Sequence, residues 1–377
     1  MKNITYKIAD SVSQIKKEDW DSVFGDIPEG CQFYKTLEES RLEDFSFYYI
    51  ALYQQDACLL IAPVFITDFN LDIAVNGFTE RIIQGIRKFS PRFMVIKTLF
   101  CGSPFGEHGA LGIRKDIEDK GALIGELIKI MNEFSRFKNT PLIIFKDFLK
   151  EESLLSDSLG KCGFFRVKSF PSAVTELNFS SFDEYLKSLG HSTRKNLRRK
   201  IKKAYSQGDI QVKIADRVDD IIDDIHRLYV NTYHSGATKF ERLTKEFFIN
   251  VGKNLAGQAK FFLYYVNGKL GAFNLCFVHR DLFIDKFIGF DYDISSRYNL
   301  YFVSWCYNIE WCLKNSIRFY QSGQTDYYPK IRLGGRLIPL YAYLKYKNVA
   351  VNSFLKLLAI FLKPENFDPD IRDSANV

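Results

Sequence analysis

The chain has 377 residues, of which 46% are hydrophobic and 16% aromatic, so it is long and apolar enough for two or three domains and is not disordered over most of its length. The N-terminal residues show no secretory signal, and no run of eighteen apolar residues predicts a membrane span. Seven cysteines without a CxxC pair are typical of reduced thiols, and five scattered histidines show no metal-ligand spacing. We therefore expect a soluble, cytoplasmic protein without a metal site.

The first part of the chain, residues 1–178, alternates strand and helix patterns. Residues 48–53 and 58–66 predict a hairpin, because aromatic and aliphatic runs flank a short polar turn. An amphipathic helix is predicted over 116–136. Further strands are predicted over 95–100, 141–145 and 172–179. Cys101 and His108 would suggest a thiol nucleophile and its base only if the fold joined them, and a buried cysteine is the favoured interpretation.

A basic segment follows, in which seven of the ten residues from Arg194 to Lys203 are Lys or Arg. Without these seven, the chain carries 45 basic and 45 acidic residues, so the segment accounts for the whole net charge of +7. Ser192 or Thr193 is placed to cap a helix. Apolar residues recur at helical spacing at Leu189, Leu197, Ile201 and Ala204. The segment predicts a helix with a narrow apolar seam and a cationic face for a phosphorylated or acidic partner, the alternative being a solvated face without a partner.

The second part, residues 179–350, repeats the order of the first. Asn267 and Gly268 predict a tight hairpin turn between strands at 260–266 and 270–278. Helices are predicted over 221–234, 244–255 and 300–314, and strands over 282–290 and 317–321. We interpret the halves as two related α/β domains with the basic helix at their junction, the alternative being a chance similarity. Residues 351–377 are expected to form an apolar helix and a loose tail. The apolar run 355–362 is expected to pack on the core rather than on lipid, and the loose tail begins at Pro364.

A polar cluster from Gln321 to Gly335 begins where the last of these strands ends, and ligands of α/β sheets tend to bind at strand ends. It contains a carboxylate, two phenols, two cations and several amides, the groups needed to position an amine, take its proton and stabilise an oxyanion. The candidate catalytic residues are Asp326, Tyr328 and Lys330. Substrate contacts are expected from Gln321, Gln324 and Tyr233. The alternative is an ordinary polar loop.

These residues suggest a family. The order of Ser192, Arg194, Asn196, Arg198 and Arg199 resembles the basic S-x-R-x-N-x-R-R segment of the GNAT-like acyltransferases related to the Fem peptidyltransferases. Gly323, Tyr328 and Lys330 resemble the late G-x-x-x-x-Y-K motif of that family, with Pro329 inserted between Tyr and Lys. Residues 228–233 and 267–272 resemble its Y-x-x-T helix and dG-x-x-aG hairpin. The likeness covers about residues 180–350.

The resemblance implies an α/β (α+β) fold of two tandem GNAT-like domains, each a mixed sheet flanked by helices, that transfers an acyl group to an amine. The donor would be a thioester of coenzyme A or of acyl carrier protein. Its phosphates, or the acidic carrier, would contact Arg194, Asn196, Arg198, Arg199 and Lys202. Tyr328 and Lys330 would lie beside the acyl group, although Pro329 displaces Lys330 by one position. Asp326 is a further candidate for the base, which we add to the residues that the resemblance implies.

Two alternatives remain beside this N-acyltransferase. A Fem-type enzyme would use aminoacyl-tRNA on a cell-wall precursor, but the sequence shows no long heptad insert of the kind that Fem enzymes often carry. A non-catalytic protein would bind nucleic acid or anionic lipid through the basic helix, with steep salt dependence and no turnover. The first hypothesis requires the basic helix and the tyrosine–lysine loop to lie together.

Overall fold

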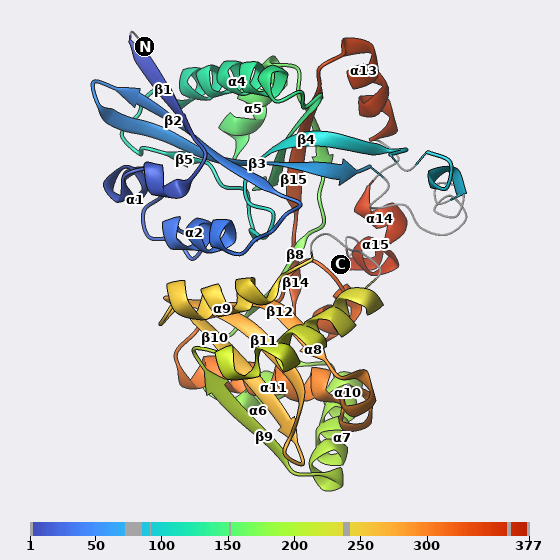
Figure 1. Cartoon of the computed structure of the whole chain (residues 1–377). Coiled ribbons are helices and arrows are strands. Elements are labelled where there is room, and N and C mark those ends of the chain that lie inside the picture. Colours follow the sequence, from blue (N-terminus) through green and yellow to red (C-terminus); the bar gives the residue numbers. More distant parts are fainter. Residues whose placement is uncertain are drawn as a thin grey trace. The chain divides into compact units, whose positions relative to one another are not determined.

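The computed structural model of the chain describes residues 3–71, 85–90, 92–150, 152–236, 242–359 and 363–374. The chain forms two compact units, each built on its own mixed β-sheet (Figure 1). Unit 1 comprises Met1–Glu38, Leu42–Pro171 and Pro339–Val377, and unit 2 comprises Glu39–Arg41 and Ser172–Ile338. The predicted division at 178 and 350 differs from these units, because the chain leaves unit 2 at Ile338 and adds a further strand to the sheet of unit 1.

The sheet of unit 1 contains one parallel pair, β4 with β6, and its other neighbouring strands are antiparallel. The strand order is β1 (Ile4–Ala9), β2 (Ser46–Gln54), β3 (Ala57–Asn70), β4 (Val95–Cys101), β6 (Leu142–Leu149), β15 (Leu340–Tyr346) and β7 (Phe165–Lys168), with β5 (Gly112–Ile113) beside β3. The predicted hairpin is β2–β3, and its turn residues Gln55 and Asp56 have φ angles of 48° and 65°.

Within the described residues, the helices of unit 1 include α1 (Lys17–Phe24), α2 (Cys31–Glu39), α4 (Lys120–Phe137), α5 (Ser153–Lys161), α13 (Val349–Leu358), α14 (Pro364–Phe367) and α15 (Pro369–Ser374). The amphipathic helix predicted over 116–136 is α4, whose Leu123 and Leu127 are fully buried. The C-terminal tail, predicted to be loose, contains α14 and α15. There Glu365 pairs with Lys168 of β7, and Ile371 is buried.

The sheet of unit 2 also contains one parallel pair, β12 with β13. Its strand order is β14 (Arg336–Ile338), β8 (Ser172–Glu176), β13 (Phe319–Gln321), β12 (Leu282–Phe290), β11 (Lys269–His279), β10 (Ala259–Val266) and β9 (Ile210–Ala215). The predicted turn between β10 and β11 is confirmed, since Asn267 and Gly268 have φ angles of 49° and 80°.

Helices cover both faces of this sheet. α8 (Ile222–Ser235) and α9 (Lys245–Asn254) lie on one face, where the ring of Phe248 packs on Phe273. α11 (Leu300–Lys314) lies on the other, where Trp305 packs on Tyr320. α6 (Phe182–Ser188), α7 (His191–Gln207) and α10 (Tyr292–Tyr298) contact α11, and the short α12 (Tyr327–Arg332) follows β13. The expected α/β fold of two mixed sheets flanked by helices is confirmed.

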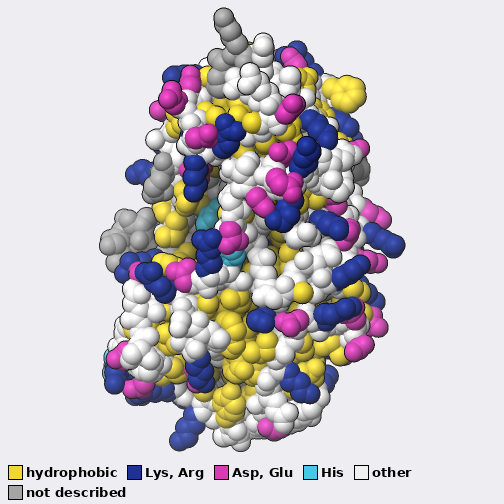
Figure 2. Space-filling view, turned by 90° about the vertical axis from the view of Figure 1, so that its left-hand side faces the viewer, with side chains coloured by type: hydrophobic (Ala, Val, Ile, Leu, Met, Phe, Trp, Pro, Cys, Tyr) yellow, Lys and Arg dark blue, Asp and Glu magenta, His cyan; other side chains and the backbone are white. Residues whose placement is uncertain are grey.

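One face of the molecule carries charged side chains of both signs (Figure 2). On the face shown in Figure 2, Lys and Arg side chains are mixed with Asp and Glu side chains, and hydrophobic side chains gather in its lower half, over unit 2. Within the described residues, no helix combines the length and the apolar character that crossing a bilayer requires.

Candidate functional site

The basic segment forms α7, which begins at His191 and has Gly190 as its N-cap. The expectation that Ser192 or Thr193 caps the helix is therefore wrong: the chain enters the helix earlier, and both hydroxyls lie in its first turn. The predicted apolar seam is present, because Leu197 and Ala204 are buried in the core that also contains residues of α11.

Several cations of α7 are engaged within unit 2. Nη1 of Arg194 donates to the carbonyls of the residues that end α6, namely Leu186, Lys187 and Leu189, at 3.5, 3.0 and 3.2 Å. Arg198 pairs with Asp183 at 3.0 Å, and Arg199 donates to Oδ1 of Asn196 at 3.0 Å. Lys202 is exposed and has no ion pair among the described residues. Arg194 thus has a structural role at the end of α6, whereas Arg199 and Lys202 remain on the exposed cationic face.

We expect Arg194→Ala to lower the free energy of unfolding by about 1–2 kcal/mol, because the carbonyls at the end of α6 lose a charged donor. The matched control is Arg199→Ala on the same helix, for which a change below about 0.5 kcal/mol is expected. Urea unfolding followed by circular dichroism measures both. Equal losses for the two variants would show that Arg194 does not stabilise α6.

The predicted polar cluster forms a tight loop and α12. Gly323 and Asp326 have φ angles of 80° and 51°, and Asp326 is the N-cap of the helix. Pro329 lies in the first turn of α12, where a backbone N–H has no helical acceptor, so the inserted proline does not break the helix. Lys330 is only 7% exposed, and its ammonium donates to the backbone carbonyl of Ser322. The loop therefore holds one lysine in the interior of unit 2.

Arg332 joins α12 to the start of α7. Its guanidinium donates to Oγ1 of Thr193 at 3.1 and 3.2 Å and to Oγ of Ser192 at 3.3 Å. It also donates to the hydroxyl of Tyr328 at 2.7 Å, and Tyr328 is 55% exposed. The sequence analysis did not select Arg332, although its spacing of four residues from Tyr328 places both on one side of a helix. These bonds make the basic helix and the tyrosine–lysine segment neighbours.

The parallel ladder of unit 2 ends beside this loop. β13 pairs with β12 only from Leu282 to Ile284, whereas β12 continues to Phe290. The register of β12 with β11 also shifts between Leu275 and Cys276, which marks a bulge. Beyond Ile284, β12 continues without β13 as a ladder partner, because β13 ends at Gln321, and we refer to this place as the β12–β13 opening.

Asp285 is the first residue of β12 after the ladder with β13. Its carboxylate accepts hydrogen bonds from Nδ2 of Asn274 at 2.8 and 3.0 Å and from the hydroxyl of Tyr320 at 2.8 Å. Burial raises the pKa of Asp285, while these hydrogen bonds and the Lys330 ammonium act in the opposite direction. A partly buried carboxyl with a raised pKa, held by two hydrogen-bond donors and subject to the charge of a lysine, is a candidate acid–base group. The sequence analysis missed it; the available signal was an acidic residue inside a largely apolar strand.

Several buried polar atoms of unit 2 have no hydrogen-bond partner within the described part of the chain. Among them are Oδ1 of Asn274, Nδ2 of Asn308, the hydroxyl of Tyr301 and Nε2 of Gln324. Burial raises the pKa of Tyr301, and the carboxylates of Asp326 and Asp285 raise it further, so this phenol lies within electrostatic reach of both. Buried polar atoms are rarely unpaired, so these atoms offer donors and acceptors to a polar ligand.

Not all of the other predicted site residues lie at the β12–β13 opening. Gln321 is buried at the end of β13, where its Nε2 donates to Oγ of Ser172 at 2.9 Å. Tyr233 lies on α8, where its ring contacts those of Tyr229 and His234. No contact among the described residues joins Tyr233 to α12. Its expected role as a substrate contact therefore has no support from the geometry of the loop.

Cys101 shows the features of a buried structural thiol. Its Sγ lies 3.8 Å from the carbonyl oxygen of Ala110, and burial raises the pKa of the thiol. No hydrogen bond joins it to His108 in the described ranges. A thiol with a raised pKa is a poor nucleophile at neutral pH, which agrees with the favoured interpretation of this cysteine.

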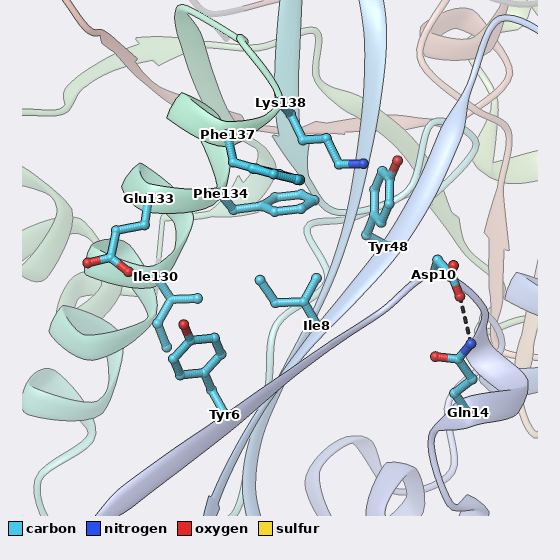
Figure 3. A pocket seen from close by; sticks show the side chains of 10 residues that line it. All are labelled: Tyr6, Ile8, Asp10, Gln14, Tyr48, Ile130, Glu133, Phe134, Phe137 and Lys138. Carbon is cyan, nitrogen blue, oxygen red and sulfur yellow. Dashed lines mark hydrogen bonds between the residues drawn. The ribbon is translucent and has the colours of Figure 1, made fainter.

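Two concave regions of about 520 Å³ each lie on unit 1 and contain none of the predicted site residues. Figure 3 shows the first, between α4 and the strands β1 and β2. The rings of Tyr48, Phe134 and Phe137 lie around Nζ of Lys138, which is 4.5 Å from the centre of the Tyr48 ring. The aromatic end of this pocket is thus occupied by a lysine of the protein itself.

The two units together have the fold of tandem GNAT proteins. A tandem GNAT protein from the clavulanic acid biosynthesis pathway matches with a TM-score of 0.50 and 8% identity, covering 92% of this chain and 99% of that chain. FemX matches with a TM-score of 0.56 and 11% identity, covering 93% and 100%. L-PGS from Bacillus licheniformis matches with a TM-score of 0.51 and 11% identity, covering 89% and 97%. At these identities the likeness concerns the fold, which is two GNAT-like domains.

Residues 191–330 match the acetyltransferase (GNAT) domain family. The match begins at the first residue of α7 and ends at Lys330, so it includes the basic helix, the β12–β13 opening and the loop before α12. The resemblance drawn from the sequence is confirmed: residues 191–330 form a GNAT-like acyltransferase domain, and the chain has a tandem-domain fold like that of FemX.

A longer relative is also known. The chain is 24% identical over 332 residues to a Mycobacterium tuberculosis protein that carries the provisional name 8-amino-7-oxononanoate synthase 2. The alignment covers 86% of this chain but 43% of that protein, so the chain spans less than half the length of this relative.

Proposed function

We propose that the chain transfers an acyl group from a thioester donor, an acyl-CoA or acyl carrier protein, to an amine of a small molecule or peptide-like acceptor. The observation that carries this proposal is the place of Asp285 and Lys330 at the β12–β13 opening, inside the segment that matches the GNAT family: Asp285 directly follows the ladder with β13, and Lys330 donates to the carbonyl of Ser322, the residue after β13. One group is a proton acceptor with a raised pKa, and the other is a buried cation.

The reaction requires a base for the amine and a positive group for the oxyanion. The amine nitrogen attacks the thioester carbonyl, a C–N bond forms, and the C–S bond breaks. In our proposal Asp285 takes the proton that the amine loses, and this proton then passes to the leaving thiolate. The Lys330 ammonium stabilises the oxyanion. No covalent enzyme intermediate is needed, because positioning and electrostatic stabilisation supply most of the rate. Asp326, the base expected from the sequence, is exposed and remains the alternative.

The donor is proposed to lie along α7. The exposed cations of this helix include Lys195, Arg199, Lys202 and Lys203. They suit the phosphates of coenzyme A or an acidic carrier protein. Because Arg332 joins the start of α7 to α12, a donor held on α7 has a short path to Lys330.

We expect the double variant Arg199→Ala, Lys202→Ala to raise the KM for the donor by about 5- to 25-fold, since each exposed charge contributes up to about 1 kcal/mol. The kcat should change little, because neither residue touches the reacting atoms. Thiol release measures both constants. Lys253→Ala, an exposed lysine of α9, is the matched control. An unchanged donor KM in the double variant would contradict the role of α7.

Transfer from aminoacyl-tRNA is the second candidate, favoured by the full-length match in fold to FemX and by a cationic face that also suits a polyanion. Thermal-shift measurements with coenzyme A, acyl-CoA, acyl carrier protein and tRNA separate the candidates. A donor at 100 times its Kd should stabilise the protein by about 2.7 kcal/mol. Stabilisation by tRNA alone would favour the Fem-type reaction, and binding of tRNA without any turnover would favour the non-catalytic alternative.

A further inference from the structure

α13 is an apolar helix of unit 1 with no buried side chain. Its exposed residues include Val349, Val351, Phe354, Leu357 and Leu358, which are 37% to 79% exposed. Figure 1 shows the helix at the margin of unit 1. The expected packing of residues 355–362 on the core is wrong for the described part, because Leu357 and Leu358 face solvent; residues 360–362 lie outside the described residues.

A polar residue holds the helix to unit 1. Oδ1 of Asn352 accepts from the backbone N–H of Tyr346 at 2.8 Å, and its Nδ2 donates to the carbonyl of Gly163 at 3.1 Å. These contacts fix the orientation of α13, so its apolar side faces outward in a defined direction. An outward apolar face on an anchored helix indicates a binding surface.

A basic pocket of about 520 Å³ lies where α13 begins. Its charged lining consists of Lys129, Arg136, Lys345 and Lys347 with one carboxylate, Glu133. Lys347 directly precedes Asn348, the N-cap of α13, so the pocket and the apolar helix are adjacent.

Three of the four cations of this pocket form no ion pair with the residues that the structure describes. Lys129 pairs with Glu126 at 2.8 Å, but Arg136, Lys345 and Lys347 form no ion pair within the described ranges. Lys345 is partly buried, and its Nζ donates to Oδ1 of Asn132 at 3.2 Å. Burial lowers the pKa of Lys345, and the charge of Arg136 lowers it further. An anion in the pocket would relieve the repulsion between these two cations.

We propose that α13 and the basic pocket together form a docking surface for an anionic lipid bilayer. Phe354 and Leu357 would enter the interface between headgroups and acyl chains, and a lipid phosphate would lie among Arg136, Lys345 and Lys347. This inference does not depend on the acyl-transfer reaction.

Charge complementarity favours lipid as the occupant. Residues 345–359 contain Lys345, Lys347 and Lys356 and no Asp or Glu, and an apolar helix flanked by lysines suits an anionic interface. The 10 residues of α13 span about 15 Å, half the hydrocarbon thickness, so the helix would lie on the surface. A second copy of the chain is less suitable, because a two-fold interface through α13 would bring the same lysines together without an acidic partner on the helix.

The test is co-sedimentation of the full chain with vesicles of phosphatidylcholine, with and without about one third phosphatidylglycerol. We expect binding to the anionic vesicles and little to the neutral ones. The double variant Lys345→Gln, Lys347→Gln should weaken binding by about 25-fold, which is about fivefold per lysine. The double variant Phe354→Ser, Leu357→Ser should weaken it by more than about tenfold.

Matched controls separate these effects from misfolding. The double variant Lys345→Arg, Lys347→Arg should retain binding, because it keeps both charges. The changes Lys115→Gln and Leu154→Ser, at exposed positions elsewhere on unit 1, should leave binding unchanged. Thermal unfolding establishes that each variant is folded. Equal binding to both vesicle types, or no effect of either double variant, would overturn the proposal. So would stabilisation by inorganic phosphate without vesicle binding, or a dimer that dissociates when Phe354 and Leu357 are replaced.

Discussion

Replacement of Asp285 by Asn should lower the kcat of acyl transfer by about 100- to 10,000-fold, the range for loss of a general base. The Asn side chain has the same size and keeps an oxygen for the Asn274 and Tyr320 donors, but it cannot accept a proton. The donor KM should change little, because Asp285 lies in the opening and not on α7. Thiol release at saturating donor measures kcat.

The pH profile identifies the base. In the wild-type enzyme, kcat/KM should rise with pH as the Asp285 carboxyl loses its proton. Because burial raises the pKa of Asp285, the midpoint of this acid limb should lie above the ordinary Asp pKa of about 3.9. Asp285→Asn should abolish this limb. Asp326→Asn, at an exposed carboxylate, is the control, and thermal unfolding reports on the folding of both variants. If Asp326→Asn removes the limb and Asp285→Asn does not, the base is Asp326.

Replacement of Lys330 by Met should lower kcat by about 100- to 1,000-fold, because the oxyanion loses its buried cation. The same change should raise the pKa of Asp285 further, since the Lys330 ammonium lowers it in the wild-type protein. The acid limb of kcat/KM should therefore move to higher pH. A purely structural role of Lys330 would not move this limb.

The control for Lys330 is Tyr328→Phe, which removes only an exposed hydroxyl bonded to Arg332. We expect a much smaller fall in kcat than for Lys330→Met. An equal fall in both variants would place the reaction beside both Tyr328 and Lys330, as the sequence analysis expected. An unchanged kcat and pH profile in Lys330→Met would leave this lysine with a structural role, such as its bond to the Ser322 carbonyl.

Features with a local cause could be predicted from the sequence. The turn at Asn267 and Gly268 follows from residues that tolerate positive φ, and the seam of α7 follows from the spacing of Leu197 and Ala204. The position of Lys330 near the end of a strand could also be predicted, because the polar cluster directly follows the strand predicted over 317–321.

Features that depend on distant pairing could not be predicted. Asp285 is a candidate base because β12 extends beyond its ladder with β13. In addition, the hydroxyl of Tyr320, 35 residues away in the sequence, donates to its carboxylate. Arg332 bonds to Thr193 across 139 residues, which no spacing rule reveals. Arg194 resembled a donor contact, but the turn at Gly190 directs its guanidinium to the end of α6. In each case the neighbour is set by the tertiary fold.

The position of β15 has a consequence for biosynthesis. This strand lies between β6 and β7, although the segment Ser172–Ile338 of unit 2 separates it from both in the sequence. The sheet of unit 1 therefore remains incomplete until Leu340–Tyr346 leave the ribosome, and until then β6 and β7 present open edges to other nascent chains. Refolding yields should fall with protein concentration for the same reason, and a chain shortened at Ile338 would keep these edges open permanently.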